Sequence, residues 1–113
     1  MADKIEIVKG TLFVDLDGTV LHSKTEHVLE SALDKLKTAK ANGWQIIITT
    51  YRGSQWGADH KFGVVSTLST LRLHGIPFDD IVWNSPSPRV IINDEPCHAV
   101  PHKRDGSWES YDF

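Results

Sequence analysis

The stretch FVDLDGTVLH at residues 13–22 places two aspartates directly after an apolar run. In an extended chain, residues two apart face the same way, so Asp15 and Asp17 would project toward one site if the strand persists to residue 17. Like charges that close repel each other unless a cation lies between them or one carboxyl stays protonated. Gly18 permits a tight turn, and Thr19 adds a hydroxyl and a backbone N–H beside the carboxylates. The pattern indicates a site that binds a cation.

Further polar side chains follow two later apolar runs. Thr50 and Arg52 come after the run at 44–49, and Asp94 ends the run at 90–93. A hydroxyl and a guanidinium are good phosphate ligands. Three or four converging carboxylate oxygens suit a hard cation such as Mg²⁺, which in turn collects phosphate oxygens. These residue types therefore predict metal and phosphate binding, provided that the fold brings them to one place.

Hydrophobic spacing predicts the elements that must position these residues. Apolar β-type runs indicate strands at 11–15, 44–49, 81–83 and 90–93, and helical spacing indicates helices at 26–41 and 62–74. Ser23 to Glu26 reads as a capping box at the start of the first helix. In the second helix the expected inward residues are Val65, Leu68 and Leu71. Asp105-Gly106 is the hairpin signal of the tail.

The alternation of strands and helices predicts an α/β layered domain with a central, mainly parallel sheet flanked by helices. Right-handed crossovers place the strand at 44–49 beside that at 11–15, and the strand at 81–83 beyond it. The strand at 90–93 is expected on the other side of the first, which gives the order 3-2-1-4. Ligands of open sheets bind beyond the carboxyl ends of the strands, where the order reverses. Asp15 and Asp94 would stand at that point.

Three segments together are similar to the motifs of a known family. Asp15-Leu16-Asp17-Gly18-Thr19-Val20 resembles the first motif of the haloacid dehalogenase superfamily, D-x-D-G-T-[LV]. Thr50 resembles the second motif, a Thr or Ser that closes the second strand. Residues 91–95, IINDE, are similar to the fourth motif, an acidic residue that ends an apolar strand. The resemblance runs from about residue 11 to residue 96 and implies a Rossmann-like fold.

The resemblance also implies a mechanism. Asp15 would be the nucleophile that forms an aspartyl-phosphate, and Asp17 would be the general acid and then the base. Mg²⁺ would be held by Asp15, by the backbone carbonyl of Asp17 and by Asp94. Thr50 would hydrogen-bond the transferring phosphoryl group. An aspartate at position 17 favours a phosphatase over a dehalogenase.

The chain departs from the family pattern at the third motif, a lysine or arginine that neutralises the nucleophile. The corresponding turn at 83–86, WNSP, holds no cation. Arg89 would open the fourth strand, about 15 Å from Asp94 and on the wrong edge of the sheet. We therefore expect Lys61 or Arg52 to act as the substitute.

Two smaller features complete the comparison with the family. Asn93 stands where many members have a second acid, so one metal ligand is in doubt and the role of Glu95 stays open. The intervals between the motifs leave no room for a cap domain. Capless members act on large or exposed phosphate groups, which implies a phosphorylated small molecule or an exposed phosphate on a macromolecule as the partner.

Length, charge and composition limit the number of domains, the partners and the location of the protein. The 113 residues predict one domain, 1–113, and the net charge of −3 does not indicate a nucleic-acid surface, although nucleic acid stays open as a partner. Cys97 is the sole cysteine, so an internal disulfide is excluded. No run of about 18 apolar residues spans a bilayer, and the start lacks the apolar core of a signal peptide, so a cytoplasmic location is expected.

Two functions therefore compete. The first is a Mg²⁺-dependent phosphomonoester hydrolase with an aspartyl-phosphate intermediate. The second is a catalytically degenerate relative that binds metal or phosphate without turnover, which the missing lysine motivates. A receiver-like domain is rejected, because there the phosphorylated aspartate ends the third strand, which here ends in Trp83-Asn84. The substrate and the oligomeric state stay open.

Overall fold

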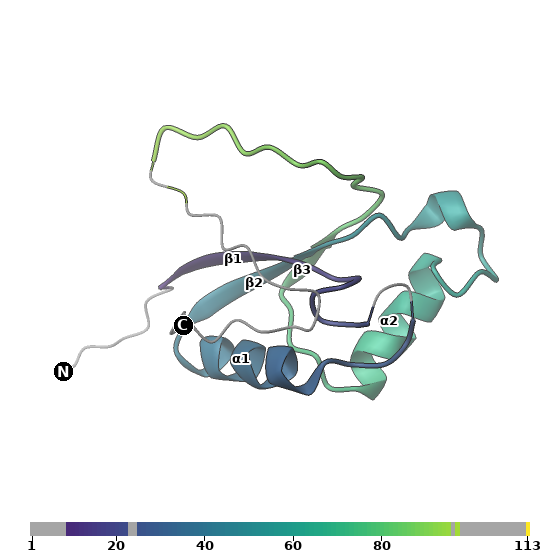
Figure 1. Ribbon diagram of the computed structural model, residues 1–113, viewed down its shortest axis with the longest axis horizontal. Coiled ribbons are helices and arrows are strands. Elements are labelled where there is room, and N and C mark those ends of the chain that lie inside the picture. Colours follow the sequence, from purple (N-terminus) through teal and green to yellow (C-terminus); the bar gives the residue numbers. More distant parts are fainter. Residues whose placement is uncertain (1–8, 23–24, 96, 98–112) are drawn as a thin grey trace.

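The computed structural model describes residues 9–22, 25–95, 97 and 113. Its elements, in chain order, are β1 (Gly10–Asp15), α1 (Glu30–Ala41), β2 (Trp44–Thr49), the 3₁₀ turn η1 (Ser54–Trp56), α2 (Val64–Leu73) and β3 (Asp80–Val82) (Figure 1). The expected hairpin at 105–106 lies outside the described residues. None of the described helices is long and apolar enough to cross a membrane.

The three strands form one parallel sheet with β2 in the middle. Asp15 of β1 lies opposite Thr49 of β2, and Thr49 lies opposite Val82 of β3. The carboxyl ends of all three strands therefore meet at one edge. This neighbour order and the α/β class agree with the expectation from right-handed crossovers.

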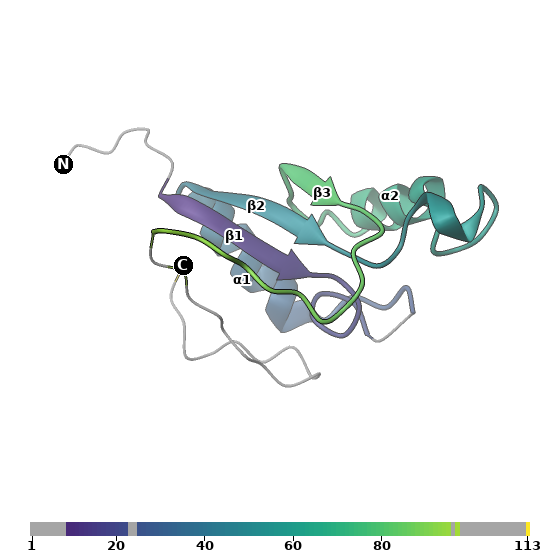
Figure 2. The same cartoon turned by 90° about the horizontal axis from the view of Figure 1, so that it is seen from above.

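The expected fourth strand is not formed by the described residues 90–93. After β3 the chain turns at the carboxyl edge, and residues 84–95 run back toward the amino ends of the strands, apart from β1 (Figure 1 and Figure 2). Val90 and Ile92 are 81% and 95% exposed. Strand preference of such residues reflects a fit to a half-buried surface, and this segment has no such surface against it.

The core lies between the sheet and the two helices, which cover the same face of the sheet (Figure 1). Alternation along the strands sends Val14, Ile46 and Ile48 into this core. Phe13, on the opposite face, is 59% exposed. The expectation of a sheet flanked by helices is therefore met on one face in the described part of the chain. The core cluster consists of Val14, Leu16, Val20, Leu21, Leu29, Ala32, Leu33, Leu36, Ile46, Ile48, Leu71 and Ile76.

Helix α1 begins four residues later than expected. Leu29 is extended at its N-cap position, and its N–H donates to the carbonyl of Val20 at 2.8 Å. Val28 forms a bridge with Leu21. These contacts hold the preceding segment against the loop after β1, so the prediction that Glu26 belongs to a capping box is wrong.

Helix α2 buries part of the expected face, because Leu68 is half-buried and only Val65 departs from the prediction. Leu71 is fully buried as predicted, but Val65 is 68% exposed. Thr67 is buried instead, and its hydroxyl accepts a hydrogen bond from Arg52 at 3.3 Å. The helix is thus turned so that a polar residue meets a buried guanidinium.

Candidate active site

The loop after β1 folds back on the end of its own strand. Gly18 has φ of 84°, a conformation that favours glycine, and its N–H donates to the carbonyl of Leu21 at 2.7 Å. The carbonyl of Leu16 accepts the N–H of Thr19 at 3.2 Å. This turn brings the Thr19 hydroxyl to Asp15 Oδ2, where it donates at 3.4 Å. The sequence prediction of a tight turn beside the carboxylates is confirmed.

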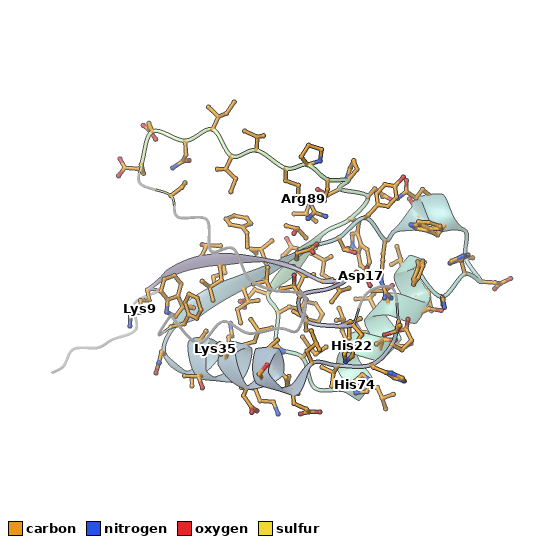
Figure 3. The ribbon with its side chains drawn as sticks, in the orientation of Figure 1. Lys9, Asp17, His22, Lys35, His74 and Arg89 are labelled. Carbon is orange, nitrogen blue, oxygen red and sulfur yellow. The ribbon has the colours of Figure 1, made fainter. Side chains whose placement is uncertain are left out.

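Asp15 closes β1 and stays accessible, with its side chain 40% exposed. Its Oδ1 accepts a hydrogen bond from Nη1 of Arg89 at 3.0 Å, while Oδ2 faces Thr19. The Arg89 guanidinium is held by Ser85, because Nη2 donates to the Ser85 carbonyl at 2.7 Å and Nε to its hydroxyl at 3.2 Å. Arg89 and the sheet are shown in Figure 3.

The prediction that Arg89 lies on the wrong edge is incorrect. It assumed that residues 90–93 form a parallel strand, whose first residue must lie at the amino edge. Instead the Ser85 N–H donates to the Thr50 carbonyl and the Asn84 N–H to the Arg52 carbonyl, both at 2.8 Å. These bonds keep the start of the segment 84–95 at the carboxyl edge of the sheet, so that Arg89 lies within reach of Asp15.

Asp17, labelled in Figure 3, points to a different arginine. Arg52 Nη2 donates to Asp17 Oδ1 at 2.7 Å, and Nε donates to Oδ2 at 3.0 Å. The Arg52 side chain is only 2% exposed, whereas that of Asp17 is 21% exposed. A two-point contact of this kind fixes the plane of the carboxylate as well as its position.

The remaining donors of Arg52 go to protein acceptors too. Nη2 also donates to the carbonyl of Thr25 at 3.1 Å, and Nη1 lies 3.4 Å from Oε2 of Glu26. The guanidinium carbon lies 4.6 Å from the centre of the Phe62 ring. Every nitrogen of the group is therefore engaged, and a phosphate would have to displace an existing contact. The prediction that Arg52 binds phosphate is not supported by this geometry.

The other predicted cation and the predicted hydroxyl also serve the local structure. Lys61 offers its carbonyl to Arg52 Nη1 at 3.5 Å, while its Nζ lies 5.3 Å from the Phe62 ring centre. Thr50 is 1% exposed, and its Oγ1 accepts the N–H of Arg52 at 3.0 Å. Thr50 stays beside the end of β3, where its N–H donates to the Val82 carbonyl at 3.0 Å.

Comparison with known proteins agrees with this arrangement. The family model for haloacid dehalogenase-like hydrolases matches residues 12–60, a range that holds Asp15, Asp17, Thr50 and Arg52. Over this range the chain is similar to haloacid dehalogenase-like hydrolases. A solved structural-genomics target from Vibrio cholerae is 24% identical with a TM-score of 0.55, over 75% of this chain and 80% of that chain, which supports the fold. None of the curated proteins matches.

Among the described residues, the predicted magnesium ligands do not form a metal-binding cluster. Asp94 is exposed and belongs to the segment 84–95, which runs back toward the amino ends of the strands (Figure 2). Asp15 forms an ion pair with Arg89, and Asp17 forms one with Arg52. Across residues 9–22, 25–95, 97 and 113, no group of three or more His, Cys, Asp or Glu side chains could hold a metal ion. The donor set in this arrangement does not fit Mg²⁺.

Asn93 and Glu95, which flank Asp94 in the chain, contact each other. The side-chain amide of Asn93 donates to the carbonyl of Glu95 at 3.0 Å. Both residues are exposed in the described segment. Within the described residues Glu95 joins no cluster of His, Cys, Asp or Glu side chains that could hold a metal ion, so the geometry assigns no ligand role to it.

Sequence reasoning missed the side chains that surround Arg52, namely Glu26 and Thr67. One signal could have indicated them. Ile46, Ile48, Thr50 and Arg52 keep the period of two of an extended chain, and all four are at most 2% exposed. A charged residue on the buried face of a strand requires charged or polar partners, which points to acceptors on the elements that cover that face.

Proposed function

We propose that the protein is a phosphatase that hydrolyses phosphomonoesters through an aspartyl-phosphate on Asp15. One observation carries this proposal. Asp15 is an accessible carboxylate at the carboxyl end of the parallel strand β1, and it has the hydroxyl of Thr19 on one oxygen and the guanidinium of Arg89 on the other. Open α/β sheets place their reacting groups at this edge.

The reaction has two steps. A carboxylate oxygen of Asp15 forms a bond to phosphorus while the ester P–O bond breaks, and the leaving alkoxide takes a proton that Asp17 has first taken up from the solvent. Water then attacks the aspartyl-phosphate, gives its proton to Asp17 and releases inorganic phosphate from Asp15. Both enzyme groups return to their starting state once Asp17 gives this proton back to the solvent, so atoms and charge balance.

Arg89 takes the role that the third-motif lysine has in the family. Its Nη1 lies 3.0 Å from Asp15 Oδ1, so its charge stands where a phosphoryl oxygen would meet the nucleophile. A cation placed there lowers the repulsion between a carboxylate and a phosphate dianion, and it stabilises the charge of the transition state. This assignment differs from the expectation from sequence, which was Lys61 or Arg52.

The resemblance to the family implies Mg²⁺ as the cofactor. Because Asp94 does not join Asp15 and Asp17, we draw no step through a metal ion. A metal requirement is measured rather than assumed in the experiment below. The substrate class stays that of a phosphorylated small molecule or an exposed phosphate on a macromolecule.

One observation favours the alternative, a degenerate relative that binds phosphate or metal without turnover. Arg52 contacts both oxygens of Asp17, and Arg89 contacts Asp15. If the contact between Arg89 and Asp15 persists when a phosphate binds, the Asp15 oxygen that must attack phosphorus stays engaged. Binding would then occur without hydrolysis.

The experiment that separates the two functions is hydrolysis of an aryl phosphate with and without Mg²⁺. Wild type, Asp15→Asn and Asp34→Asn are compared, the last as a matched change on the exposed face of α1. Turnover that is lost in Asp15→Asn and kept in Asp34→Asn supports the phosphatase and its nucleophile. A folded wild type that binds inorganic phosphate without turning over the ester supports the alternative.

A further inference from the structure

The strongest unassigned feature of the molecule is the cluster around Arg52. A guanidinium that is 2% exposed is stable only where its charge and its donors are matched. Two carboxylates provide the charge, because Asp17 lies at 2.7 Å from Nη2 and Glu26 at 3.4 Å from Nη1. The cluster therefore connects the reacting loop to a carboxylate that belongs to a different segment.

The contacts of Arg52 come from four separate parts of the chain. They are the loop after β1 through Asp17, the segment before α1 through Thr25 and Glu26, the loop before α2 through Lys61, and α2 itself through Thr67. The Phe62 ring packs on the guanidinium face. Movement of any one segment would therefore shift the group that holds Asp17.

Glu26 holds the end of Arg52 that faces away from Asp17. Its Oε2 faces Nη1 of Arg52, and its Oε1 accepts a hydrogen bond from the hydroxyl of Thr70 on α2. Nη1 is the nitrogen that does not contact Asp17, so Asp17 and Glu26 grip different parts of one rigid plane. Glu26 can therefore set the orientation of the guanidinium, and through it that of the Asp17 carboxylate.

We infer that Arg52 and Glu26 form a positioning unit that fixes the Asp17 carboxylate relative to Asp15. The inference rests on the proposed function, in which Asp17 moves a proton at the group that Asp15 attacks. Neither Arg52 nor Glu26 touches the reacting atoms, and both act through Asp17. Small displacements of a catalytic group lower the rate strongly while substrate binding changes little.

The first test is kinetic and uses an aryl phosphate. Arg52→Lys keeps the charge but loses the two-point contact, and we expect kcat to fall by about 10- to 100-fold with KM changed by less than about 3-fold. Glu26→Gln, at a half-buried site that tolerates change, is expected to lower kcat by about 3- to 10-fold. Matched controls are Arg72→Lys on α2 and Glu30→Gln on α1, both exposed and outside the cluster.

A double variant distinguishes positioning from a general structural role. In an Asp17→Asn background, Arg52→Lys should lower the residual kcat by less than about 2-fold, because the group that it positions is already gone. An equal loss of kcat in both backgrounds would overturn the inference, since Arg52 would then act independently of Asp17.

A readout without activity keeps the inference separate from the proposed function. Urea midpoints are measured for Asp17→Asn, for Arg52→Lys and for the double variant. The same three variants are then measured in a protein that also carries Glu26→Gln. If Asp17 and Arg52 are coupled, the double variant shifts the urea midpoint by less than the sum of the two single shifts. Glu26→Gln should make this difference between sum and observed shift smaller. Additive shifts overturn the inference whatever the activity. Coupled shifts in a protein without turnover uphold the contact and reject the phosphatase.

Discussion

Arg89 reaches Asp15 across 74 residues of sequence, and Nη1 donates to Oδ1 at 3.0 Å. The contact supplies the charge that the turn after β3 lacks. It depends on Ser85, which binds the Arg89 guanidinium through its carbonyl and its hydroxyl, and whose N–H is bonded to the Thr50 carbonyl. The position of the cation is thus set by the end of β2 and not by a fourth strand.

Arg89→Ala is expected to lower kcat/KM for an aryl phosphate by about 100-fold, because one preorganised donor at a reacting group typically has an effect of that size. Steady-state kinetics on wild type, Arg89→Ala and Arg89→Lys provide the measurement. Arg89→Lys should retain more activity than Arg89→Ala, since it keeps the charge and loses only the planar fork. An Arg89→Ala variant with wild-type kcat/KM would remove Arg89 from the proposed mechanism.

Much of the fold could be predicted from local pattern. The apolar run at 44–49 coincides with β2, and the strand at 11–15 differs from β1 by one residue. Parallel order followed from the crossovers, because handedness leaves few ways to connect strands through helices. Asp15, Gly18 and Thr19 could be placed together for the same reason, since neighbouring residues in a tight turn need no long-range information.

The contacts of the two arginines could not be predicted, because they depend on distant segments. Val90, Ile91 and Ile92 have strand-forming side chains, yet no neighbour covers them, so the strand assigned to them was wrong and Arg89 was misplaced. Arg52 is predicted to bind phosphate, whereas in the structure its side chain is 2% exposed and meets acceptors on α2 and on the segment before α1. Propensity carries no information on which distant residues meet.

Gly53→Ala is expected to disturb the attachment of the segment that carries Arg89. A Cβ at Gly53, where φ is 150°, would lie 2.4 Å from Oδ1 of Asn84, and the Asn84 N–H bonds the Arg52 carbonyl. We expect a loss of about 1–3 kcal/mol in the free energy of unfolding, measured by urea denaturation. Gly57→Ala is the control, because its φ is 89° but nothing lies within 4 Å of the added Cβ. Equal losses in both variants would mean that the Asn84 contact is unimportant.

Two leucines near the end of α2 give a matched test of the core. Leu71 is 0% exposed and belongs to the core cluster, whereas Leu73 is 81% exposed. Leu71→Ala should lower the free energy of unfolding by about 2–5 kcal/mol, because it removes buried contacts and leaves a cavity. Leu73→Ala should change it by less than about 0.5 kcal/mol. Similar urea midpoints for the two variants would place the buried face of α2 elsewhere.

The last prediction concerns pH and the amino-terminal edge of the sheet. The hydrogen bond from Lys40 lowers the pKa of Asp79, and the backbone N–H of Ile46, which donates to Oδ2 at 2.7 Å, lowers it further. A pKa that is lower in the folded state contributes stability above the unfolded value, and this contribution is lost as the pH falls through the folded value.

Asp79→Asn should therefore lower the free energy of unfolding by about 1 kcal/mol at pH 7, the size expected for a partly exposed ion pair with a backbone hydrogen bond. The difference between the two proteins should begin to shrink below about pH 4, where Asp79 of the unfolded chain takes up a proton, and it is lost once the folded carboxyl is neutral as well. Urea denaturation of both proteins between pH 7 and pH 3 measures it. A difference that stays constant over this range would show that shape, and not the charge of Asp79, stabilises the start of β2.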